Sequence, residues 1–291
     1  MLSILIPIYN FKVVTLVKAL MRQCKKLDID YEIICFDDKS RKKIKYENSV
    51  LSDFFGVNYT ELSENLGRAR IRNWMAKSAS YETLLFLDCD SKIVKKDFVK
   101  TYLDRAADAD LISGGRRYSK KAPSAKTKRL HWKYGTRKES IKASARQREK
   151  YLFFHSNNFL VKRDVILSYP FDESHQGYGY EDLLWAKKIM DGGLNILHID
   201  NPVEHLGLEK SDVFLRKTKQ SIVNLKLLRS VHPDFETQLT RFADRIERWG
   251  LRNKMYSFYS RRVESFESGL MAGSQSLYQL TILKLMWYWS E

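Results

Sequence analysis

The sequence predicts an α/β fold in which a mostly parallel central sheet is flanked by helices and followed by a helical C-terminal appendage. The first observation is that short apolar runs, rich in β-branched and aromatic residues, recur through the first hundred residues, as buried parallel strands do. The second is that apolar residues at the helical i, i+3, i+4 spacing lie between these runs. The third is a change near residue 211, beyond which the pattern is almost entirely helical.

Strands and helices are expected to alternate from the start of the chain. Residues 2–8 and 31–36 are apolar runs typical of strands, and residues 13–24 between them carry apolar side chains at helical spacing. Because this order implies a parallel, doubly wound sheet, ligands are expected beyond the carboxyl ends of its strands. The other elements expected before residue 207 are strands at 57–62, 81–87, 111–114, 158–161 and 195–198 and helices at 66–79 and 181–190.

The chain is expected to divide at residue 207. Residues 1–207 hold the α/β domain, and residues 208–291 are predicted to form two or three helices packed on or beside it. The final stretch, residues 277–289, is unusually apolar and aromatic. Packing onto the main domain or onto a partner subunit is the favoured interpretation. The alternative is peripheral contact with a membrane, because interfacial helices combine Trp and Leu with basic residues.

The positive charge is concentrated in one segment. The chain carries a net charge of +16, and residues 116–150 contain 14 Lys or Arg residues but only two acids. Two glycines precede this segment and its apolar periodicity is weak, so we expect a long loop or inserted excursion. A solvated surface and an anion-attracting lip both fit such a run, the anions being phosphates, an acidic acceptor or anionic lipid headgroups.

Composition argues against several classes of protein. With 44% hydrophobic residues the chain can bury a core and is not intrinsically disordered. No apolar run approaches the roughly 18 residues of a membrane-spanning helix, and the apolar start lacks the basic leader of a signal peptide. The cysteines Cys24, Cys35 and Cys89 are odd in number and widely spaced, which disfavours a disulfide framework or a zinc site. A cytoplasmic protein is therefore expected.

Acidic residues follow two of the predicted strands. Asp88 and Asp90 come directly after an apolar run, and two carboxylates at this spacing suit Mg²⁺ or Mn²⁺. Asp37 and Asp38 follow another run, where acids can accept hydrogen bonds from the base or ribose of a nucleotide. Each pair also has a simpler interpretation as a strand-to-turn junction, in which Asp is common.

Three further features could carry chemistry. Gly67 and Arg68 open a predicted helix, which suits a diphosphate through the helix dipole and charge-assisted hydrogen bonds. Glu181 and Asp182 begin another helix after a loop of two glycines and two tyrosines, so they are either catalytic or simply acids favoured at a helix N-terminus. His205 could complete a Mn²⁺ site, a role for which three other histidines compete. These are His155, His175 and His198.

The order of the motifs is more specific than any one of them. The first motifs are Ser3-Ile4-Leu5-Ile6-Pro7-Ile8-Tyr9-Asn10, Asp37-Asp38, Asn65-Leu66-Gly67 with Ala69 and Arg72-Asn73, and Leu87-Asp88-Cys89-Asp90. They resemble glycosyltransferase family 2 and its GT-A fold over about residues 1–105. A second block runs from Asn157-Asn158 through Gly179-Tyr180-Glu181-Asp182 to His205. It is similar to the C-terminal part shared by galactosyl- and N-acetylgalactosaminyl-transferases.

The resemblance implies where the donor and the metal bind. Residues 1–105 would form a nucleotide-binding half, in which Asp38 contacts the base, usually uracil, and Arg68 lies near the diphosphate. Pro7 and Tyr9 would border the nucleotide pocket, with Asp88 facing the ribose or sugar. The implied metal is Mn²⁺ or Mg²⁺, and its ligands would be Asp90 and His205 together with Asp88.

The resemblance also implies a reaction. Residues 106–207 would form an acceptor half that carries the basic insertion 116–150. A sugar would pass, with inversion, from a nucleotide-sugar, most often a UDP-sugar, to a hydroxyl of a glycan or glycolipid, as in polysaccharide biosynthesis. Asp182, with Glu181 beside it, would deprotonate that hydroxyl. The acceptor would be bound by Asn157, Asn158, Tyr178, Gly179 and Tyr180.

Two departures from the family pattern concern the acceptor more than the donor. Lys39-Ser40-Arg41 replaces the usual Gly-Ser turn after Asp38, and Tyr180 stands where Gly or Trp is often found.

Two other functions are consistent with parts of the sequence. A nucleic-acid-binding protein would explain the charge of residues 116–150 but not the acids at the strand ends, so nucleic acid is disfavoured as a partner. An inactive GT-A scaffold would explain the fold but not the intact acids. Contact with an anionic membrane, through residues 116–150 or the C-terminal helix, would place the protein on the inner face of the cytoplasmic membrane.

Overall fold

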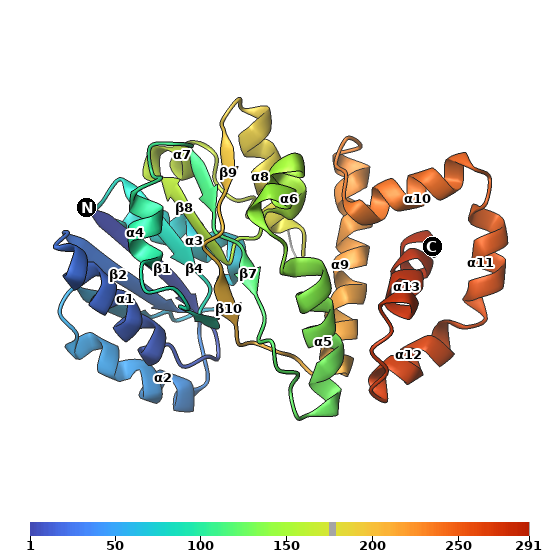
Figure 1. Cartoon of the computed structure of the whole chain (residues 1–291), viewed down its shortest axis with the longest axis horizontal. Helices are drawn as coiled ribbons and strands as arrows, with labels where there is room; N and C mark the ends of the chain where they lie inside the picture. Colours follow the sequence, from blue (N-terminus) through green and yellow to red (C-terminus); the bar gives the residue numbers. More distant parts are fainter. Residues whose placement is uncertain (175–178, 291) are drawn as a thin grey trace. The chain divides into compact units, whose positions relative to one another are not determined.

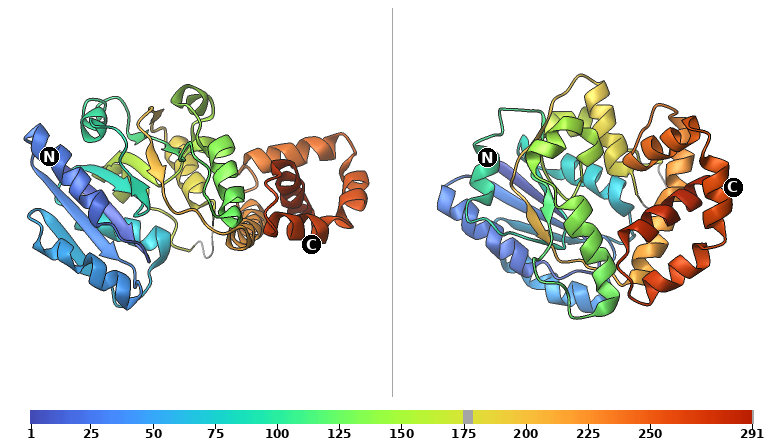
Figure 2. Two further views of the ribbon diagram at one scale, coloured as in Figure 1. Left: turned by 60° about the horizontal axis from the view of Figure 1, so that its bottom comes forward. Right: turned by 45° about the vertical axis from the view of Figure 1, so that its right-hand side comes forward.

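The structure is a computed structural model that describes residues 1–174 and 179–290 (Figure 1 and Figure 2). The chain forms two compact units. The first unit consists of Met1–Arg117, Ser140–His175 and Glu181–Gly207, and the second of Tyr118–Glu139, Gln176–Tyr180 and Leu208–Glu291. The basic segment is therefore shared, because its middle part clusters with the C-terminal helices and its ends belong to the first unit.

A seven-stranded sheet forms the centre of the first unit, in the order β3-β2-β1-β4-β8-β6-β9. β1 is parallel to β2 and β4, β2 is parallel to β3, and β6 is parallel to β9. Only β8 runs antiparallel to its neighbours within this sheet. The predicted mostly parallel sheet is confirmed. Its strands are β1 (Leu2–Ile8), β2 (Tyr31–Asp37), β3 (Val57–Glu61), β4 (Thr83–Leu87), β6 (Leu111–Ser113), β8 (Asn158–Lys162) and β9 (Ile196–His198).

Helices cover both faces of this sheet, and alternate residues of each strand pack against opposite layers (Figure 1). In β1, Ile4 and Ile6 join the core formed with α1 and α4, whereas Leu5 joins the core formed with α3, α7 and α8. This double burial explains why the strands are continuous apolar runs. The helices are α1 (Val14–Leu27), α2 (Lys42–Asn48), α3 (Gly67–Ser78), α4 (Phe98–Leu103), α7 (Arg163–Ser168) and α8 (Glu181–Asp191), with a 3₁₀ turn at Ser49–Asp53.

A small three-stranded sheet lies in the same unit, in the order β5-β10-β7. β10 (Val203–His205) is antiparallel to β5 (Ser91–Lys92), with His205 opposite Ser91. On its other side β10 is parallel to β7 (Arg116–Arg117). The small sheet joins three segments that are far apart in the sequence. β5 directly follows Asp90, β7 begins with Arg116, and β10 ends with His205.

The expectation of a long loop at residues 116–150 is wrong. The segment contains several short helices, and four- to six-residue helices are too short to show a helical repeat in the sequence. Arg146 lies buried inside the first unit, where its guanidinium donates to the main-chain oxygens of Ile141 (3.1 Å) and Ile199 (2.7 Å). The helices are α5 (Arg129–Tyr134), a π-helical turn at Gly135–Glu139, α6 (Ala143–Arg146), and 3₁₀ turns at Lys126–Lys128, Gln147–Glu149 and Tyr151–Phe153.

The C-terminal region forms five helices over the described residues 208–290, where two or three were predicted. α13 is the central one, because its side chains join two apolar clusters formed with the surrounding helices. Its hydrophobicity is therefore accounted for by packing within the second unit. The helices are α9 (Ser211–Val231), α10 (Gln238–Arg248), α11 (Arg252–Ser260), α12 (Val263–Met271) and α13 (Leu277–Trp289).

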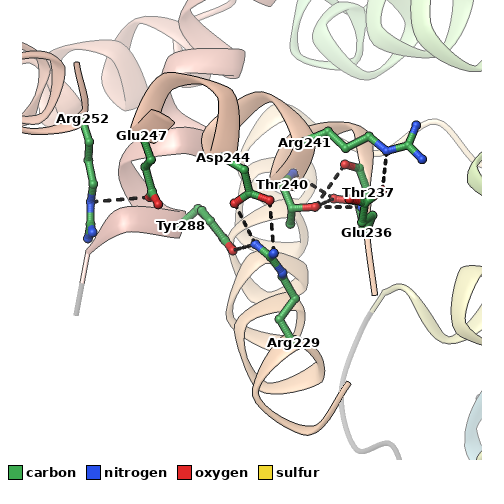
Figure 3. Close-up of polar contacts among 9 residues, drawn as sticks. All are labelled: Arg229, Glu236, Thr237, Thr240, Arg241, Asp244, Glu247, Arg252 and Tyr288. Carbon is green, nitrogen blue, oxygen red and sulfur yellow. Dashed lines mark hydrogen bonds and ion pairs between the residues drawn. The ribbon is translucent and has the colours of Figure 1, made fainter. Parts of the chain in front are cut away.

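Polar contacts tie three of these helices together (Figure 3). Arg229 on α9 donates two hydrogen bonds of 3.1 Å to the two carboxylate oxygens of Asp244 on α10 and one of 2.7 Å to the Tyr288 hydroxyl on α13. Thr237 caps α10 through reciprocal side-chain and main-chain bonds with Thr240. Across the parts of the chain that the structure describes, no helix is both long and apolar enough to cross a bilayer.

Candidate active site

The candidate site lies where parallel strands of the first unit end. Ile8, the last residue of β1, is level with Asp37 at the end of β2, and β4 lies on the other side of β1 in parallel register. The acids that follow these strands therefore gather at one edge of the sheet, as ligand-binding groups do in parallel α/β sheets. Tyr9 follows β1 at this edge and is 57% exposed, whereas Pro7 is within the strand opposite Phe36.

Asp38 holds the start of α3. Its carboxylate accepts hydrogen bonds from the main-chain N–H groups of Leu66 (2.6 Å) and Gly67 (3.1 Å). Burial raises the pKa of Asp38, and these two hydrogen bonds oppose that rise. The carboxylate therefore fixes the turn at residues 65–67, in which Gly67 has a φ of +77° that other residues rarely adopt.

Asp88 is bonded to a buried arginine, Arg72, which belongs to the family motif but was expected to have no particular role. Arg72 on α3 is 3% exposed, and its Nη2 donates to Asp88 Oδ1 at 2.8 Å. A second bond runs from Nη1 to the main-chain oxygen of Arg68 (3.1 Å), and the guanidinium lies over the Phe171 ring. Two sequence signals pointed to Arg72, its place with Asn73 in the family motif and its position beside Ile71, which packs against the sheet.

Asp90 is paired with His205 through the small sheet. The Nδ1 atom of His205 lies 3.4 Å from Asp90 Oδ1. Burial would raise the pKa of Asp90, but the neighbouring imidazole of His205 and the positive charges of Arg116 and Arg68 outweigh it, so this pKa lies below its ordinary value. A Cβ on Gly207 would come within 2.1 Å of Asp90 Oδ2, so the space beside this carboxylate requires glycine.

The carboxylate of Asp90 and the imidazole of His205 are a suitable oxygen and nitrogen pair for Mn²⁺ or Mg²⁺. No three His, Cys, Asp or Glu side chains cluster closely enough to hold a metal ion within residues 1–174 and 179–290. Asp88 is therefore not gathered with the other two expected ligands, and its carboxylate contacts Arg72. A two-residue set fits Mg²⁺-type sites, in which substrate phosphates and water supply the remaining ligands.

Asp182 is paired with His155, one of the histidines considered for the metal. The Nδ1 atom of His155 lies 3.7 Å from Asp182 Oδ2 at the start of α8. Burial would raise the pKa of Asp182, but the neighbouring imidazole of His155, the charge of Arg116 and a hydrogen bond from the Leu183 N–H together lower it. The preceding acid, Glu181, forms a 3.3 Å ion pair with Arg68.

Arg116 acts electrostatically on both Asp90 and Asp182. Its positive charge lowers the pKa of both Asp90 and Asp182. Its Nε donates to Asn157 Oδ1 at 3.3 Å, which attaches it to the residue before β8. In the sequence Arg116 stands out only as the first residue of the basic segment. Nothing in the local pattern separates it from the other 13 cations there.

The remaining expected acceptor residues differ in their surroundings. Asn158 is completely buried, and its amide bonds the main-chain oxygens of Gly115 (2.8 Å) and Asn201 (2.9 Å). Gly179 and Tyr180 belong to the second unit and have φ angles of +100° and +69°. Tyr178 and His175 lie outside the described residues. His198 is buried against Arg146, away from both carboxylate pairs in its contacts.

The family described as Glycosyl transferase family 2 matches residues 3–169, more than half of the chain. The chain belongs to glycosyl transferase family 2. None of the curated proteins matches it significantly in sequence.

The chain is similar in fold to solved structures of low sequence identity and spans less than two thirds of the length of most of them. A mannosyltransferase from Pyrobaculum calidifontis, in complex with GDP-Man and Mn²⁺, has a TM-score of 0.55 and 15% identity, over 78% of this chain and 64% of that one. Residues 1–349 of TarS from S. aureus, in complex with UDP-GlcNAc, have a TM-score of 0.52 and 15% identity, over 97% of this chain and 90% of that one. These likenesses support the GT-A fold. The similarity of residues 157–205 to galactosyl- and N-acetylgalactosaminyl-transferases stays a prediction, because the family match ends at residue 169.

Proposed function

We propose that this glycosyltransferase moves a sugar from a UDP-sugar to a hydroxyl of a glycan or glycolipid, with a divalent metal and with inversion at the anomeric carbon. The observation that carries the proposal is the presence of two separate carboxylate–imidazole pairs, Asp90 with His205 and Asp182 with His155. The first pair is suited to binding a metal ion and the second to accepting a proton. A metal-dependent sugar transfer needs both a metal site and a proton acceptor.

The donor end of the proposed reaction uses the first pair. Asp90 and His205 would hold Mn²⁺ or Mg²⁺, which neutralises the negative charge that develops on the leaving diphosphate. Arg68, whose side chain is 54% exposed, would orient the diphosphate by charge-assisted hydrogen bonds. Arg72 keeps Asp88 in a fixed orientation, in which its second carboxylate oxygen can accept a hydrogen bond from the ribose or sugar.

The acceptor end uses the second pair. A sugar hydroxyl is a weak acid, so a carboxylate in hydrogen-bond reach must take its proton as the new glycosidic bond forms. Asp182 has a pKa below its ordinary value and is therefore ionised and able to accept this proton at neutral pH. Attack on the face of the sugar opposite the leaving group inverts the anomeric centre, through an oxocarbenium-like transition state.

The proposed cellular setting is the cytoplasm, with the acceptor reached either in solution or at the inner face of the membrane. The exposed cations of the basic segment favour an anionic surface as the second setting.

Calorimetric titration of UDP, with and without Mn²⁺ and repeated with GDP, tests the donor half of this proposal. We expect UDP to bind in a metal-dependent way and Asp90→Ala to remove the metal dependence. If neither nucleotide binds under either condition, the donor site is absent and an inactive GT-A scaffold becomes the better description. A panel of UDP-sugars and glycan acceptors then identifies the substrates of the active protein.

A further inference from the structure

A groove of about 390 Å³ on the first unit shares no residue with the candidate active site. It lies between the second half of α1 and the segment that follows β5. Its volume is within the range of small-molecule binding sites, about 300–1,000 Å³. Its lining residues are Ala19, Arg22, Gln23, Lys26, Ile93, Val94, Lys95 and Lys96.

Four cations and no carboxylate line this groove. Arg22 and Lys26 are one helical turn apart on α1, and they lie across the groove from the consecutive Lys95 and Lys96. Within the described ranges 1–174 and 179–290, none of the four forms an ion pair with an acid. Like charges at i, i+4 repel each other and destabilise a helix, so this cluster costs the folded protein stability that a bound anion would restore.

The groove is held in shape by hydrogen bonds. The side-chain amide of Gln23 donates to the main-chain oxygen of Lys95 (2.8 Å) and accepts from the N–H of Val99 (2.9 Å). Lys95 also donates through Nζ to the main-chain oxygen of Asp200, so its ammonium group is anchored. These bonds join α1 to the segment that follows β5 and so fix the two walls of the groove, from which the exposed side chains of Arg22, Lys26 and Lys96 extend.

The floor of the groove is apolar. Ala19, Ile93 and Val94 are each half-buried, whereas Arg22 and Lys26 are exposed. An apolar floor with a cationic rim suits a molecule that carries a phosphate on a carbon skeleton better than it suits an inorganic anion alone.

We propose that this groove binds a phosphate ester at a site separate from the donor site. The phosphate would lie between Arg22 and Lys26 on one side and Lys95 and Lys96 on the other, where guanidinium and ammonium groups donate charge-assisted hydrogen bonds to its oxygens. The organic part would contact the apolar floor. The ester could be a soluble phosphate or the headgroup of an anionic lipid, since both present the same group.

The test compares two double variants of the full chain that change the net charge equally. Arg22→Glu with Lys26→Glu reverses two cations of the groove, whereas Lys18→Glu with Lys25→Glu reverses two exposed cations of the same helix that do not line it. Thermal melting shows whether each variant is folded, and UDP titration reports on the donor site independently.

Two kinds of probe distinguish the sources of the ester. Calorimetry with sn-glycerol 3-phosphate and inorganic phosphate measures binding of soluble phosphates, and flotation with phosphatidylglycerol against phosphatidylcholine vesicles measures binding of a lipid headgroup. We expect at least one phosphate ester to bind the natural chain and its affinity to fall on the order of tenfold or more in the groove variant, with little change in the control variant.

Some results would overturn the proposal. The first is that the natural chain binds neither soluble phosphate nor phosphatidylglycerol vesicles. The second is that it binds inorganic phosphate as well as it binds sn-glycerol 3-phosphate. The third is that both double variants lose the same amount of phosphate affinity. Binding only of a long polyanion such as RNA, with equal losses in both variants, would indicate a general effect of net charge.

Discussion

The imidazole of His155 lies 3.7 Å from the carboxylate of Asp182, and the same relationship recurs between His205 and Asp90 at 3.4 Å. In both pairs burial would raise the carboxyl pKa, and the imidazole and Arg116 lower it instead. The site therefore keeps two carboxylates ionised in partly buried positions. This is the electrostatic condition for binding a metal with one of them and accepting a proton with the other.

Replacing Asp182 by Asn should remove the proton acceptor without removing the side chain's volume. We expect the rate of sugar transfer to fall by about 10²–10⁴-fold, the usual contribution of a positioned general base. Metal-dependent UDP affinity should change by less than about twofold, as calorimetry can check. Asp191→Asn is a matched control, because Asp191 is at the other end of α8 and its side chain, which is 61% exposed, pairs with Lys187 of the same helix. Near-normal transfer by the Asp182 variant would show that another group is the base.

Replacing His155 by Gln should move the acidic side of the pH–rate profile. Activity requires ionised Asp182, so it falls as the pH drops through the pKa of this residue. His155 lowers that pKa, and its removal should shift the acidic limb of kcat/KM to higher pH. The rate on the alkaline side of the limb should change less. His232→Gln, in the second unit, should leave the profile in place, and an unmoved limb in the His155 variant would argue against the Asp182–His155 pair as the base.

Most of the fold could be predicted from the sequence because its signals are local. Strands β1, β2, β4 and β8 are short, largely apolar runs, and the acids Asp38, Asp88 and Asp90 come directly after β2 and β4. The basic segment was misjudged because its helices are shorter than two turns and show no repeat. The number of C-terminal helices was underestimated even though Pro233, Gly250 and Gly273 stand in turns between them, and such breaker residues could have marked these turns.

The contacts of the site could not be predicted because they join residues distant in the sequence. Arg72 meets Asp88 only when α3 packs on the sheet, and His155 meets Asp182 only when α8 returns beside β8. Arg146 looks like one cation among many in a basic run. It is buried because the carbonyl oxygens of several turns converge on its guanidinium, and no sequence pattern encodes that convergence.

Replacing Arg72 by Met should destabilise the first unit. The change leaves Asp88 without its 2.8 Å partner and removes bonds to two main-chain oxygens. Because the Asp88 side chain is 34% exposed and can regain water, we expect a loss of about 1–3 kcal/mol in the free energy of unfolding, below that for a fully buried charge pair.

Arg70→Met is the control for this experiment. Arg70 is on the same helix, but its ion pairs with Glu64 and Glu173 are long and exposed. Such pairs contribute about 0–1 kcal/mol, so urea unfolding should separate the two variants. Equal midpoints would mean that the Arg72–Asp88 contact contributes nothing beyond a surface pair.

Replacing Gly207 by Ala should disturb Asp90. The added Cβ would come within 2.1 Å of Asp90 Oδ2, and either the carboxylate or the main chain must move. If Asp90 binds the metal, Mn²⁺-dependent UDP affinity should fall on the order of tenfold, because metal ligands tolerate little displacement. Gly269→Ala, at a helical position with nothing within 4 Å of the new Cβ, should leave UDP binding unchanged. Retention of full affinity by the Gly207 variant would contradict the assigned metal site.

His198 should make the stability of the first unit fall as the pH is lowered below 6.5. Burial, aided by the charge of Arg146, lowers the pKa of His198 to about 4. Its Nδ1 lies 2.6 Å from Nη1 of Arg146, which can only donate, so Nδ1 must accept and Nε2 must donate to the Lys150 oxygen at 2.8 Å. A proton on Nδ1 would oppose the guanidinium.

Between about pH 6.5 and 4 the unfolded chain therefore binds a proton at residue 198 that the folded chain does not, and the free energy of unfolding decreases by up to roughly 3 kcal/mol from this residue. Urea unfolding at pH 7 and at pH 4.5 measures the decrease. His198→Gln is expected to be less stable at pH 7, because it loses buried hydrogen bonds, but to depend less steeply on pH. The change in the free energy of unfolding between the two pH values separates the titration of His198 from the loss of its packing. If this change is the same in the variant, His198 is not the group that titrates.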